Sequence, residues 1–169
     1  MKRLNLFDKA LGVALVIAIL LIASKAFALT EDRQRTCLAQ NIYFEAGNQP
    51  FSGKLAVANV VLNRVESSQF PDTICEVVKQ TKKYKKSWLT GELIPVRGLC
   101  QFSWFCDGRP DVPQDSATLI EAARVANLAI DSNLDITMGA LFYHADYSNP
   151  YWSDHLERLV QIETHIFYK

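Results

Sequence analysis

A chain of 169 residues with 49% hydrophobic side chains is long enough for one folded domain with its own core. Its 18 basic residues are balanced by 18 acidic ones. This balance argues against nucleic acid as the main partner, because binding to phosphates needs a basic excess. A local excess does occur at Lys79, Lys82, Lys83, Lys85 and Lys86. That run is either a solvated loop or helix end, or a surface attracted to an anionic envelope polymer or lipid.

The N-terminal residues have the features of an export signal. Lys2, Arg3 and Lys9 flank the start of an apolar stretch over residues 10–23, and residues 26–28 form an Ala-Phe-Ala cleavage pattern. The stretch is short for a membrane span, which needs about 20 apolar residues. We therefore expect residues 1–28 to be a cleaved signal peptide. A signal anchor retained in the inner membrane by residues 10–28 is the alternative, and a buried core helix is the least favoured. An exported domain over residues 29–169 then lies in the periplasm or cell envelope.

The first element predicted after the leader is a helix over residues 31–46. Leu38, Ile42 and Glu45 recur at i, i+4 and i+7, which places them on one face of that helix. The Gly-Asn-Gln-Pro sequence of residues 47–50 predicts the end of the helix and a turn. Glu45 is therefore expected in the last turn, on the apolar face.

Two more helices are predicted next. Residues 53–65 predict a buried helix, because its middle is apolar nearly all round except at Asn59. Residues 71–72, Pro-Asp, open a third helix, in which Thr73 and Glu76 have the spacing of a capping box.

The remainder combines a loop, a helix and short strands. Residues 81–99 are polar and contain two glycines and a proline, so they predict a loop. An alanine-rich helix is predicted over residues 116–130, with Thr118 and Glu121 again in capping-box spacing. Two short strands are predicted near the C-terminus, over residues 141–144 and 162–166. The fold class that follows is α+β: a single, mainly helical domain with a small β element.

All four cysteines lie after the leader, and an even number in an exported chain predicts disulfides. Four cysteines allow three pairings. Cys100 and Cys106 bracket one short loop, so we favour that pair, which leaves Cys37 with Cys75. A zinc site is disfavoured because the chain contains no C-x-x-C pair. We expect no metal and no other cofactor.

Glu45 is the strongest candidate for a catalytic residue. Most glutamates in a helix simply face water, but Glu45 shares its face with Leu38 and Ile42. An apolar surface disfavours the charged form of a carboxyl group, so the pKa of Glu45 is expected to rise. A raised pKa allows a carboxylic acid to donate a proton to a glycosidic oxygen near neutral pH.

Two further segments offer side chains that suit a sugar polymer. In residues 100–104 amide and hydroxyl groups alternate with flat aromatic rings, and in residues 142–146 a tyrosine and a histidine stand side by side. Either segment is also compatible with an ordinary structural role, as a loop with buried aromatics or a strand with a core tyrosine. The candidate substrate-binding residues are Gln101, Phe102, Ser103, Tyr143, His144 and Trp152.

Six motifs follow one another along the chain. They are residues 39–47 (AQNIYFEAG), 53–65 (GKLAVANVVLNRV), 70–71 (FP), 75–78 (CEVV), 100–103 (CQFS) and 143–145 (YHA). Together they resemble the cell wall hydrolase family named for the spore cortex-lytic enzymes. The family usually has Glu-Ala-Arg-Gly-Glu where this chain has Glu-Ala-Gly-Asn-Gln at residues 45–49. The resemblance implies a lysozyme-like fold related to lytic transglycosylases, in which Glu45 matches the catalytic glutamate, and a peptidoglycan substrate.

Most glycosidases use two carboxylates, but none of Asp107, Asp111 and Asp146 has a motif position comparable to that of Glu45. A single-acid mechanism therefore fits better. Glu45 protonates the oxygen between N-acetylmuramic acid and N-acetylglucosamine, then accepts a proton from the 6-hydroxyl of the muramic sugar as an anhydro ring closes. Gln101, Ser103 and Tyr143 would hold the substrate and stabilise the charged transition state.

Two other functions remain open. A zinc amidase that cuts the peptide from the glycan would need three metal ligands, and the histidines at positions 144, 155 and 165 show no recognisable ligand spacing. A non-catalytic peptidoglycan-binding module would leave Glu45 as a buried acid without a chemical role. Activity on purified sacculi separates this module from an enzyme, and sensitivity to chelators separates the amidase from the glycan-cutting enzyme.

The leader gives the first testable prediction. If residues 1–28 are removed on export, protein recovered from the envelope fraction has the intact mass of a chain that begins at Leu29. A full-length mass in the membrane fraction would instead support the anchor, and protein confined to the cytoplasm would contradict both.

Overall fold

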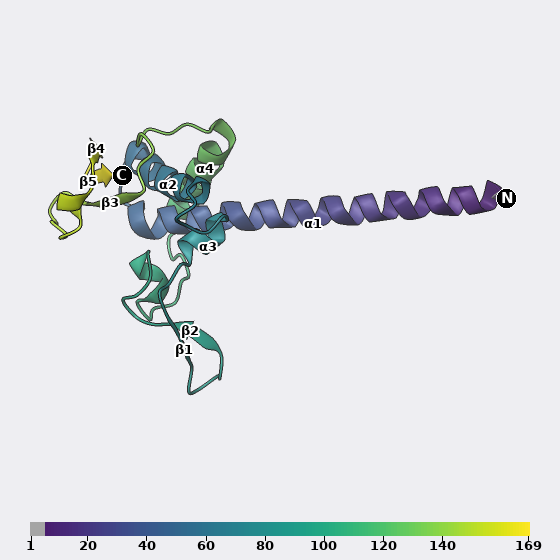
Figure 1. Cartoon of the computed structure of the whole chain (residues 1–169), viewed down its shortest axis with the longest axis horizontal. Coiled ribbons are helices and arrows are strands. Elements are labelled where there is room, and N and C mark those ends of the chain that lie inside the picture. Colours follow the sequence, from purple (N-terminus) through teal and green to yellow (C-terminus); the bar gives the residue numbers. More distant parts are fainter. Residues whose placement is uncertain (1–5) are drawn as a thin grey trace. The chain divides into compact units, whose positions relative to one another are not determined.

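The computed structural model describes the backbone of residues 6–169 and the side chains from residue 15 onward (Figure 1). The elements are α1 (Leu6–Ala46), α2 (Phe51–Glu66), α3 (Ile74–Val78), β1 (Tyr84–Lys86), β2 (Leu93–Pro95), the 3-10 helix η1 (Ser103–Cys106), α4 (Ser116–Ser132), β3 (Phe142–Ala145), the 3-10 helix η2 (Ser153–His155), β4 (Arg158–Ile162) and β5 (His165–Tyr168). The chain divides into two compact units, Met1–Arg33 and Gln34–Lys169, with the boundary inside α1. The predicted fold class is confirmed, because the second unit is mainly helical with small antiparallel sheets.

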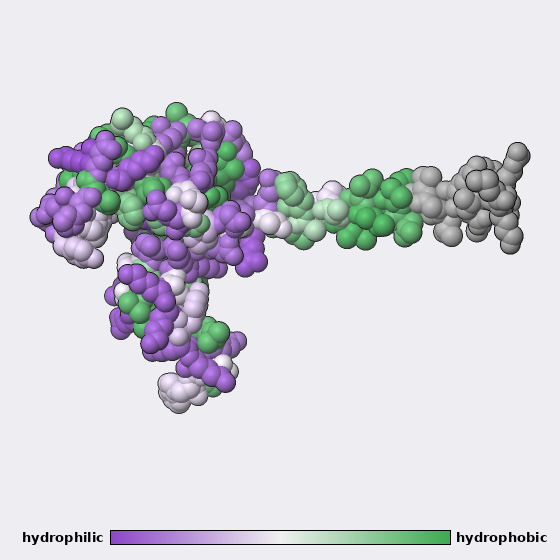
Figure 2. Space-filling view, viewed as in Figure 1, coloured by the Kyte–Doolittle hydropathy of each residue, from purple (hydrophilic) through white to green (hydrophobic). Residues whose placement is uncertain are grey.

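The described part of the first unit is a helix with an apolar surface. The helix predicted to start at residue 31 belongs instead to α1, which starts at Leu6. The large apolar side chains between Leu15 and Leu29 are 52–70% exposed, and Figure 2 shows them as a green band. Within the residues that the structure describes, no helix is both long enough and apolar enough to cross a membrane. The basic flank of the predicted leader, and its residues 10–14, lie outside the described side chains.

The helix ends of the second unit follow local sequence signals. α1 ends at Ala46, where it was predicted to end, and Pro50 is the N-cap residue of α2. The predicted pairing of Thr73 with Glu76 at the start of α3 is present: Thr73 is the N-cap residue, and its hydroxyl oxygen accepts a hydrogen bond from the Glu76 backbone N–H at 3.3 Å. The same hydroxyl donates to a carboxylate oxygen of Glu76 at 2.7 Å.

The capping box predicted for α4 is wrong. Asp115 is the N-cap residue, and its carboxylate accepts hydrogen bonds from the Ala117 N–H at 2.9 Å and the Thr118 hydroxyl at 2.6 Å. Glu121 turns instead toward α2, where it forms an ion pair with the buried Lys54 at 3.1 Å. Spacing alone favoured the Thr118–Glu121 pair, whereas the tertiary partner Lys54 decides where Glu121 lies.

Helix α2 is the central element of the unit, and its predicted burial is confirmed. It contacts α3, α4 and β4, and its residues from Gly53 to Val61 are all buried. One apolar cluster joins it to the other helices, and a smaller cluster packs Ala56 and Val60 against Phe167 of β5. Both clusters consist of residues from Cys37 onward, so the core lies wholly within the second unit.

The loop predicted over residues 81–99 contains a short hairpin. β1 pairs with β2 in antiparallel register, with Lys85 opposite Ile94, and an isolated bridge joins Thr81 to Cys100. Each strand has three residues and lies largely in solvent. No alternation of apolar and polar residues therefore marks them in the sequence.

The C-terminal sheet has the strand order β3-β5-β4 and is antiparallel throughout. The strand predicted over residues 162–166 is in fact two strands joined by a turn. Glu163 has a left-handed φ of 50° at this turn, and Ile162 pairs with His165 across it. Ile162 and Ile166 lie on either side of this turn with the even spacing of a single strand, so the sequence pattern resembled one continuous strand.

The two predicted disulfides are both present. Cys37 of α1 is bonded to Cys75 of α3, and Cys100 is bonded to Cys106 of η1. The first encloses a sequence separation of 38 residues and the second a separation of 6. The longer loop restricts the unfolded chain more strongly.

This difference in loop length predicts unequal effects on stability. Replacing Cys37 and Cys75 together by serine should lower the free energy of unfolding by about 4 kcal/mol, and the same change at Cys100 and Cys106 by about 2 kcal/mol. Urea denaturation of the two variants measures the difference. Thiol labelling of denatured, unreduced protein should find almost no free cysteine; four reactive thiols would contradict the pairing.

Candidate functional site

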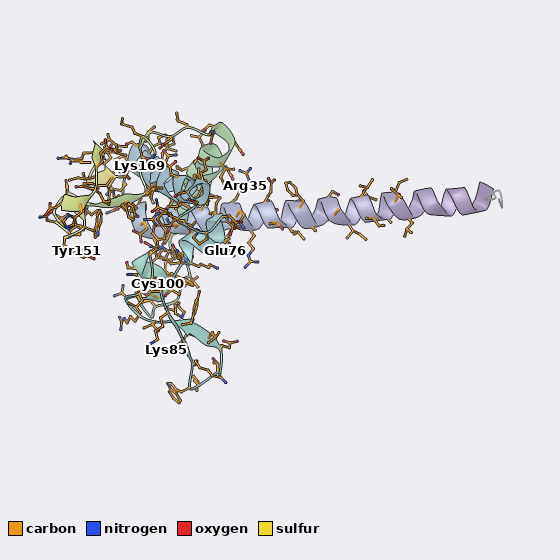
Figure 3. The ribbon with its side chains drawn as sticks, viewed as in Figure 1. Arg35, Glu76, Lys85, Cys100, Tyr151 and Lys169 are labelled. Atoms are coloured by element: carbon orange, nitrogen blue, oxygen red, sulfur yellow. A yellow bond between two sulfur atoms is a disulfide. The ribbon has the colours of Figure 1, made fainter. Side chains whose placement is uncertain are left out.

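A cleft of about 800 Å³ opens in the second unit. Three parts of the chain line it. The first contains Glu45 at the end of α1 and Arg64 near the end of α2. The second consists of residues between Gln80 and Ser103, and the third of residues between Phe142 and Leu156. Cys100, which is labelled in Figure 3, belongs to the second of these walls. The end of α1 thus meets the base of the β1–β2 hairpin and the C-terminal sheet in one hollow.

The Glu45 carboxyl group lies in this cleft and is largely withdrawn from water. Leu38 and Ile42, on the same helix face, are fully buried. The Tyr143 hydroxyl donates a hydrogen bond to the Glu45 carboxylate at 3.0 Å. Burial raises the pKa of Glu45, while the Tyr143 hydrogen bond and the Arg64 charge offset part of the rise. The predicted environment of Glu45 is therefore confirmed.

Tyr143 acts as a hydrogen-bond donor in this pair. Burial, together with the neighbouring Glu45 carboxylate, raises the pKa of Tyr143 well above its ordinary value. The hydroxyl therefore stays protonated throughout the pH range in which Glu45 titrates. Tyr143 reaches Glu45 from strand β3, whose neighbour in the sheet is β5.

The last turn of α1 is held by three other side chains around Glu45. The fully buried Asn41 accepts a hydrogen bond from the Trp104 indole N–H at 3.1 Å, and the Phe44 ring stacks on the Trp104 ring with centroids 4.6 Å apart. On the α4 side, the Tyr43 hydroxyl oxygen accepts from the backbone N–H groups of Gln114 and Asp115. These contacts fix the helix end on which Glu45 stands.

Gly47 allows α1 and α4 to approach closely just after Glu45. A Cβ atom at this position would lie 2.5 Å from the Tyr43 carbonyl oxygen and 3.2 Å from Cγ2 of Thr118. A larger residue would therefore disturb the backbone at the end of α1 and would require a small shift of the Thr118 side chain in the first turn of α4. Gly47 is the residue that stands where the family usually has arginine.

Arg64 is a buried cation beside Glu45 that sequence analysis did not single out. Its side chain is 4% exposed, its Nε donates to the Leu141 carbonyl oxygen at 2.8 Å, and its Nη1 has no partner among the described residues. Its guanidinium lies 5.0–5.8 Å from the ring centroids of Phe70, Phe102 and Phe142. In the sequence Arg64 is one of two basic residues in the helix predicted over residues 53–65, the other being Lys54, and no spacing distinguishes it.

Five of the six predicted substrate-binding residues line the cleft with Glu45. Gln101 and Ser103 are exposed to it, Phe102 is buried behind it, and Tyr143 and Trp152 stand on the opposite wall. His144 does not line the cleft. Its ring stacks on Tyr168, and its Nε2 lies 2.9 Å from the Tyr168 hydroxyl. Successive strand residues point to opposite faces, so Tyr143 and His144 were not both able to face Glu45.

Four other polar residues line the cleft and were not predicted: Gln80, Thr81, Lys82 and His155. Gln80 is held through its backbone carbonyl oxygen, which accepts from the Gln101 N–H at 2.9 Å, while its side-chain Oε1 has no partner among the described residues. None of the four belongs to a motif. Their positions depend on the Thr81–Cys100 bridge and the fold of the C-terminal segment.

Glu45 supplies the one carboxyl group among the described residues that line the cleft. Asp107, Asp111 and Asp146 lie elsewhere, and Asp107 accepts a hydrogen bond from the Arg109 backbone N–H at 2.7 Å. In the part of the chain that the structure describes, no group of three or more histidine, cysteine, aspartate or glutamate residues could hold a metal ion. The geometry thus offers one proton donor, surrounded by aromatic rings and hydrogen-bonding side chains.

Comparison with known proteins shows which family this chain resembles. The model of the family described as Cell Wall Hydrolase matches residues 48–168, a range that begins just after Glu45. A spore cortex-lytic enzyme from Bacillus cereus is 29% identical over 133 residues, which cover 78% of this chain and 42% of that enzyme. The chain therefore spans less than half the length of the curated relatives it matches.

Two solved structures share the fold. The catalytic domain of the germination-specific lytic transglycosylase SleB from Bacillus anthracis superposes with a TM-score of 0.61 at 26% identity, over 80% of this chain and 93% of that domain. The catalytic domain of the Bacillus cereus SleB protein superposes with a TM-score of 0.58 at 24% identity, over 82% and 91%. The latter likeness concerns the fold alone.

The contact between Tyr143 and Glu45 predicts a measurable pKa change. Tyr143→Phe removes a hydrogen bond that stabilises the ionised carboxylate, so the pKa of Glu45 should rise further. Carbon-13 NMR titration of the Glu45 carboxyl group measures the shift directly.

Tyr168→Phe is the matched control, because Tyr168 donates or accepts only toward His144 and stands on the neighbouring strand. It should leave the Glu45 titration unchanged. An unchanged Glu45 pKa in Tyr143→Phe would show that the hydroxyl does not contact the carboxylate in solution.

Proposed function

This chain belongs to the cell wall hydrolase family, and from that membership we propose that it cuts the glycan strands of peptidoglycan as a lytic transglycosylase with Glu45 as its catalytic acid and base. The observation that carries the proposal is the Glu45 carboxyl group, withdrawn from water in an open cleft with no second carboxyl group beside it among the described lining residues. The likeness to the catalytic domain of a lytic transglycosylase supports the same reaction.

The reaction begins with a proton transfer from Glu45. Protonated Glu45 donates to the oxygen that joins C1 of N-acetylmuramic acid to the next N-acetylglucosamine, and the bond from C1 to that oxygen breaks. The positive charge that develops at C1 is next to the new Glu45 carboxylate. That carboxylate then takes the proton of the muramic 6-hydroxyl as its oxygen bonds to C1. An anhydro ring results, no water is consumed, and Glu45 is protonated again.

Tyr143 and Arg64 suit the second half of this cycle. The Tyr143 hydrogen bond and the Arg64 charge both favour the ionised form of Glu45. They therefore lower the free energy of the state in which Glu45 has lost its proton. Burial acts in the opposite direction and keeps the acid protonated before the bond breaks. The balance between the two lets one residue serve in turn as acid and as base.

The walls of the cleft suit a sugar polymer. Trp152 offers a ring surface on one wall, while Gln101 and Ser103 on the other can donate and accept hydrogen bonds to sugar hydroxyl and acetamido groups. We assign substrate positioning to these three residues and to Tyr143. His144, which packs against Tyr168, would instead support the strand from behind.

The proposed substrate lies outside the cytoplasmic membrane, which agrees with the disulfides and with the export signal predicted over residues 1–28. We propose that the domain over residues 29–169 acts in the periplasm or cell envelope. The anchor formed by residues 10–28 remains the alternative to cleavage, and it would hold the same domain beside the inner membrane.

Glu45→Gln tests the catalytic role. The amide preserves the size of the side chain but cannot exchange a proton, so the rate of sacculus digestion should fall by about 10²–10⁴-fold. Glu66→Gln, at the exposed end of α2, is the matched control and should digest normally. Mass spectrometry of the products from the unchanged enzyme should find anhydro-muramic ends, lighter by one water than hydrolysed ends. Near-normal digestion by a folded Glu45→Gln variant would make Glu45 structural.

The raised pKa of Glu45 also fixes two pH effects. Because the first step needs the protonated acid, activity should fall as the pH rises through the Glu45 pKa. The midpoint of this fall should lie above the pKa of an ordinary glutamate.

Ionising a carboxyl group whose folded pKa is raised costs stability as the pH rises above its unfolded pKa. Glu45→Gln lacks this cost, so at pH 8 its free energy of unfolding should equal or exceed that of the unchanged protein.

A further inference from the structure

The segment of residues 81–99, called here the basic hairpin, is the most unevenly charged part of the second unit. It holds five basic residues, Lys82, Lys83, Lys85, Lys86 and Arg97, against the single acid Glu92, in a chain whose total charge is balanced. The ion pairs Arg35–Asp131 and Lys54–Glu121 lie elsewhere in the chain. In Figure 1 the basic hairpin extends away from the helices of its unit, and Lys85 on it is labelled in Figure 3.

The tip of the basic hairpin is apolar and lies in solvent. Trp88 is 93% exposed, Leu89 76% and Leu93 72%, and Figure 2 shows pale and green atoms among the purple ones at this end of the molecule. Trp88 and Leu89 lie in the turn that follows β1, and Leu93 is the first residue of β2, so this end of the hairpin leaves a considerable apolar area in water. Such a patch marks a contact surface when charged residues border it, as the lysines do here.

The basic hairpin is firmly joined to the wall of the cleft. Thr81 bridges to Cys100, the Lys82 N–H donates to the Leu99 carbonyl oxygen at 3.0 Å, and the Val96 N–H donates to the Lys83 carbonyl oxygen at 2.9 Å. Thr81, Lys82 and Leu99 themselves line the cleft. The base of the basic hairpin is thus part of the cleft wall.

We propose that the basic hairpin docks onto an anionic lipid bilayer, with Trp88, Leu89 and Leu93 entering the interface and the lysines facing phosphate groups. Tryptophan and leucine gain most at the boundary between headgroups and acyl chains, where lysine ammonium groups remain hydrated beside the lipid phosphates. A glycan polymer would match the lysines and Trp88, but it would leave the two leucine side chains without an apolar partner. An anionic lipid surface offers partners both to the lysines and to the apolar side chains of the hairpin.

Quenching of Trp88 fluorescence by brominated lipids tests the proposal on the full chain. The leader contains no tryptophan, so the signal reports the tip whether or not the leader enters the bilayer. The contribution of Trp88 is the difference between the unchanged protein and Trp88→Phe, since Trp104 and Trp152 are common to both. Vesicles containing brominated phosphatidylglycerol should quench it, vesicles of brominated phosphatidylcholine should not, and about 0.5 M salt should abolish the effect.

Two sets of variants separate charge from apolar contact. Lys85→Gln with Lys86→Gln should raise the lipid concentration for half-maximal quenching about 25-fold, because each lysine near an anionic surface contributes about a fivefold factor. Leu89→Ser with Leu93→Ser should raise it about tenfold or more. Arg109→Gln with Arg158→Gln, two exposed basic residues outside the hairpin, is the matched control and should leave it unchanged.

The outcome is independent of catalysis. In the absence of lipid, the Lys85/Lys86 variant should digest sacculi at the normal rate, since neither residue lines the cleft. Equal quenching by both lipids, or none, would overturn the proposal. A blue shift of Trp88 emission with purified sacculi but not with anionic vesicles would also overturn it and would assign the hairpin to the wall polymer.

Discussion

Removing an ionised carboxyl group from water raises its free energy, and the site depends on the groups that stabilise Glu45 in its buried position. One hydroxyl group donates to it and one guanidinium lies nearby, which is too little to cancel the effect of burial on its pKa. Glu45, Tyr143 and Arg64 come from α1, β3 and α2 respectively. The chemistry at Glu45 therefore exists only when those three elements are assembled, and the contacts around Asn41, Tyr43 and Phe44 serve that assembly.

Helix α2 makes the assembly possible because its polar side chains bind backbone groups of other elements. Asn59 donates to the Leu134 carbonyl oxygen and accepts from the Ile136 N–H, and Asn63 donates to the Ala140 carbonyl oxygen. Arg64 does the same at Leu141, one residue before β3. These bonds align the segment that leads into β3, so they fix where Tyr143 meets Glu45. Buried polar groups with such partners specify one arrangement of the core.

Much of this fold could be predicted from the sequence, because its signals are local. A glycine and a proline end α1 and begin α2, Thr73 caps α3, and Leu38 and Ile42 reveal the apolar face that Glu45 shares. The disulfide pairing followed from one short loop. In each case the residues that decide the structure are close together in the chain.

The errors have a common physical cause, which is a partner far away in the sequence. Glu121 pairs with Lys54, and His144 packs against Tyr168, so neither lies where spacing or motif position suggested. The β1–β2 hairpin has no buried face to create a pattern. Arg64 is surrounded by three phenylalanine rings, and two of them, Phe102 and Phe142, lie far from it in the sequence. Tertiary contacts of this kind leave no periodic trace in the sequence.

The Cys100–Cys106 disulfide closes a small ring around Gln101, Phe102 and Ser103, the segment that forms one wall of the cleft. Such a bond persists in an oxidising compartment and is kept reduced in the cytoplasm. The ring over residues 100–106 is therefore expected to be open while the thiols are reduced and closed once they are oxidised. In the proposed export of this domain, the cleft wall therefore gains its covalent support only in the oxidising compartment that holds the proposed substrate.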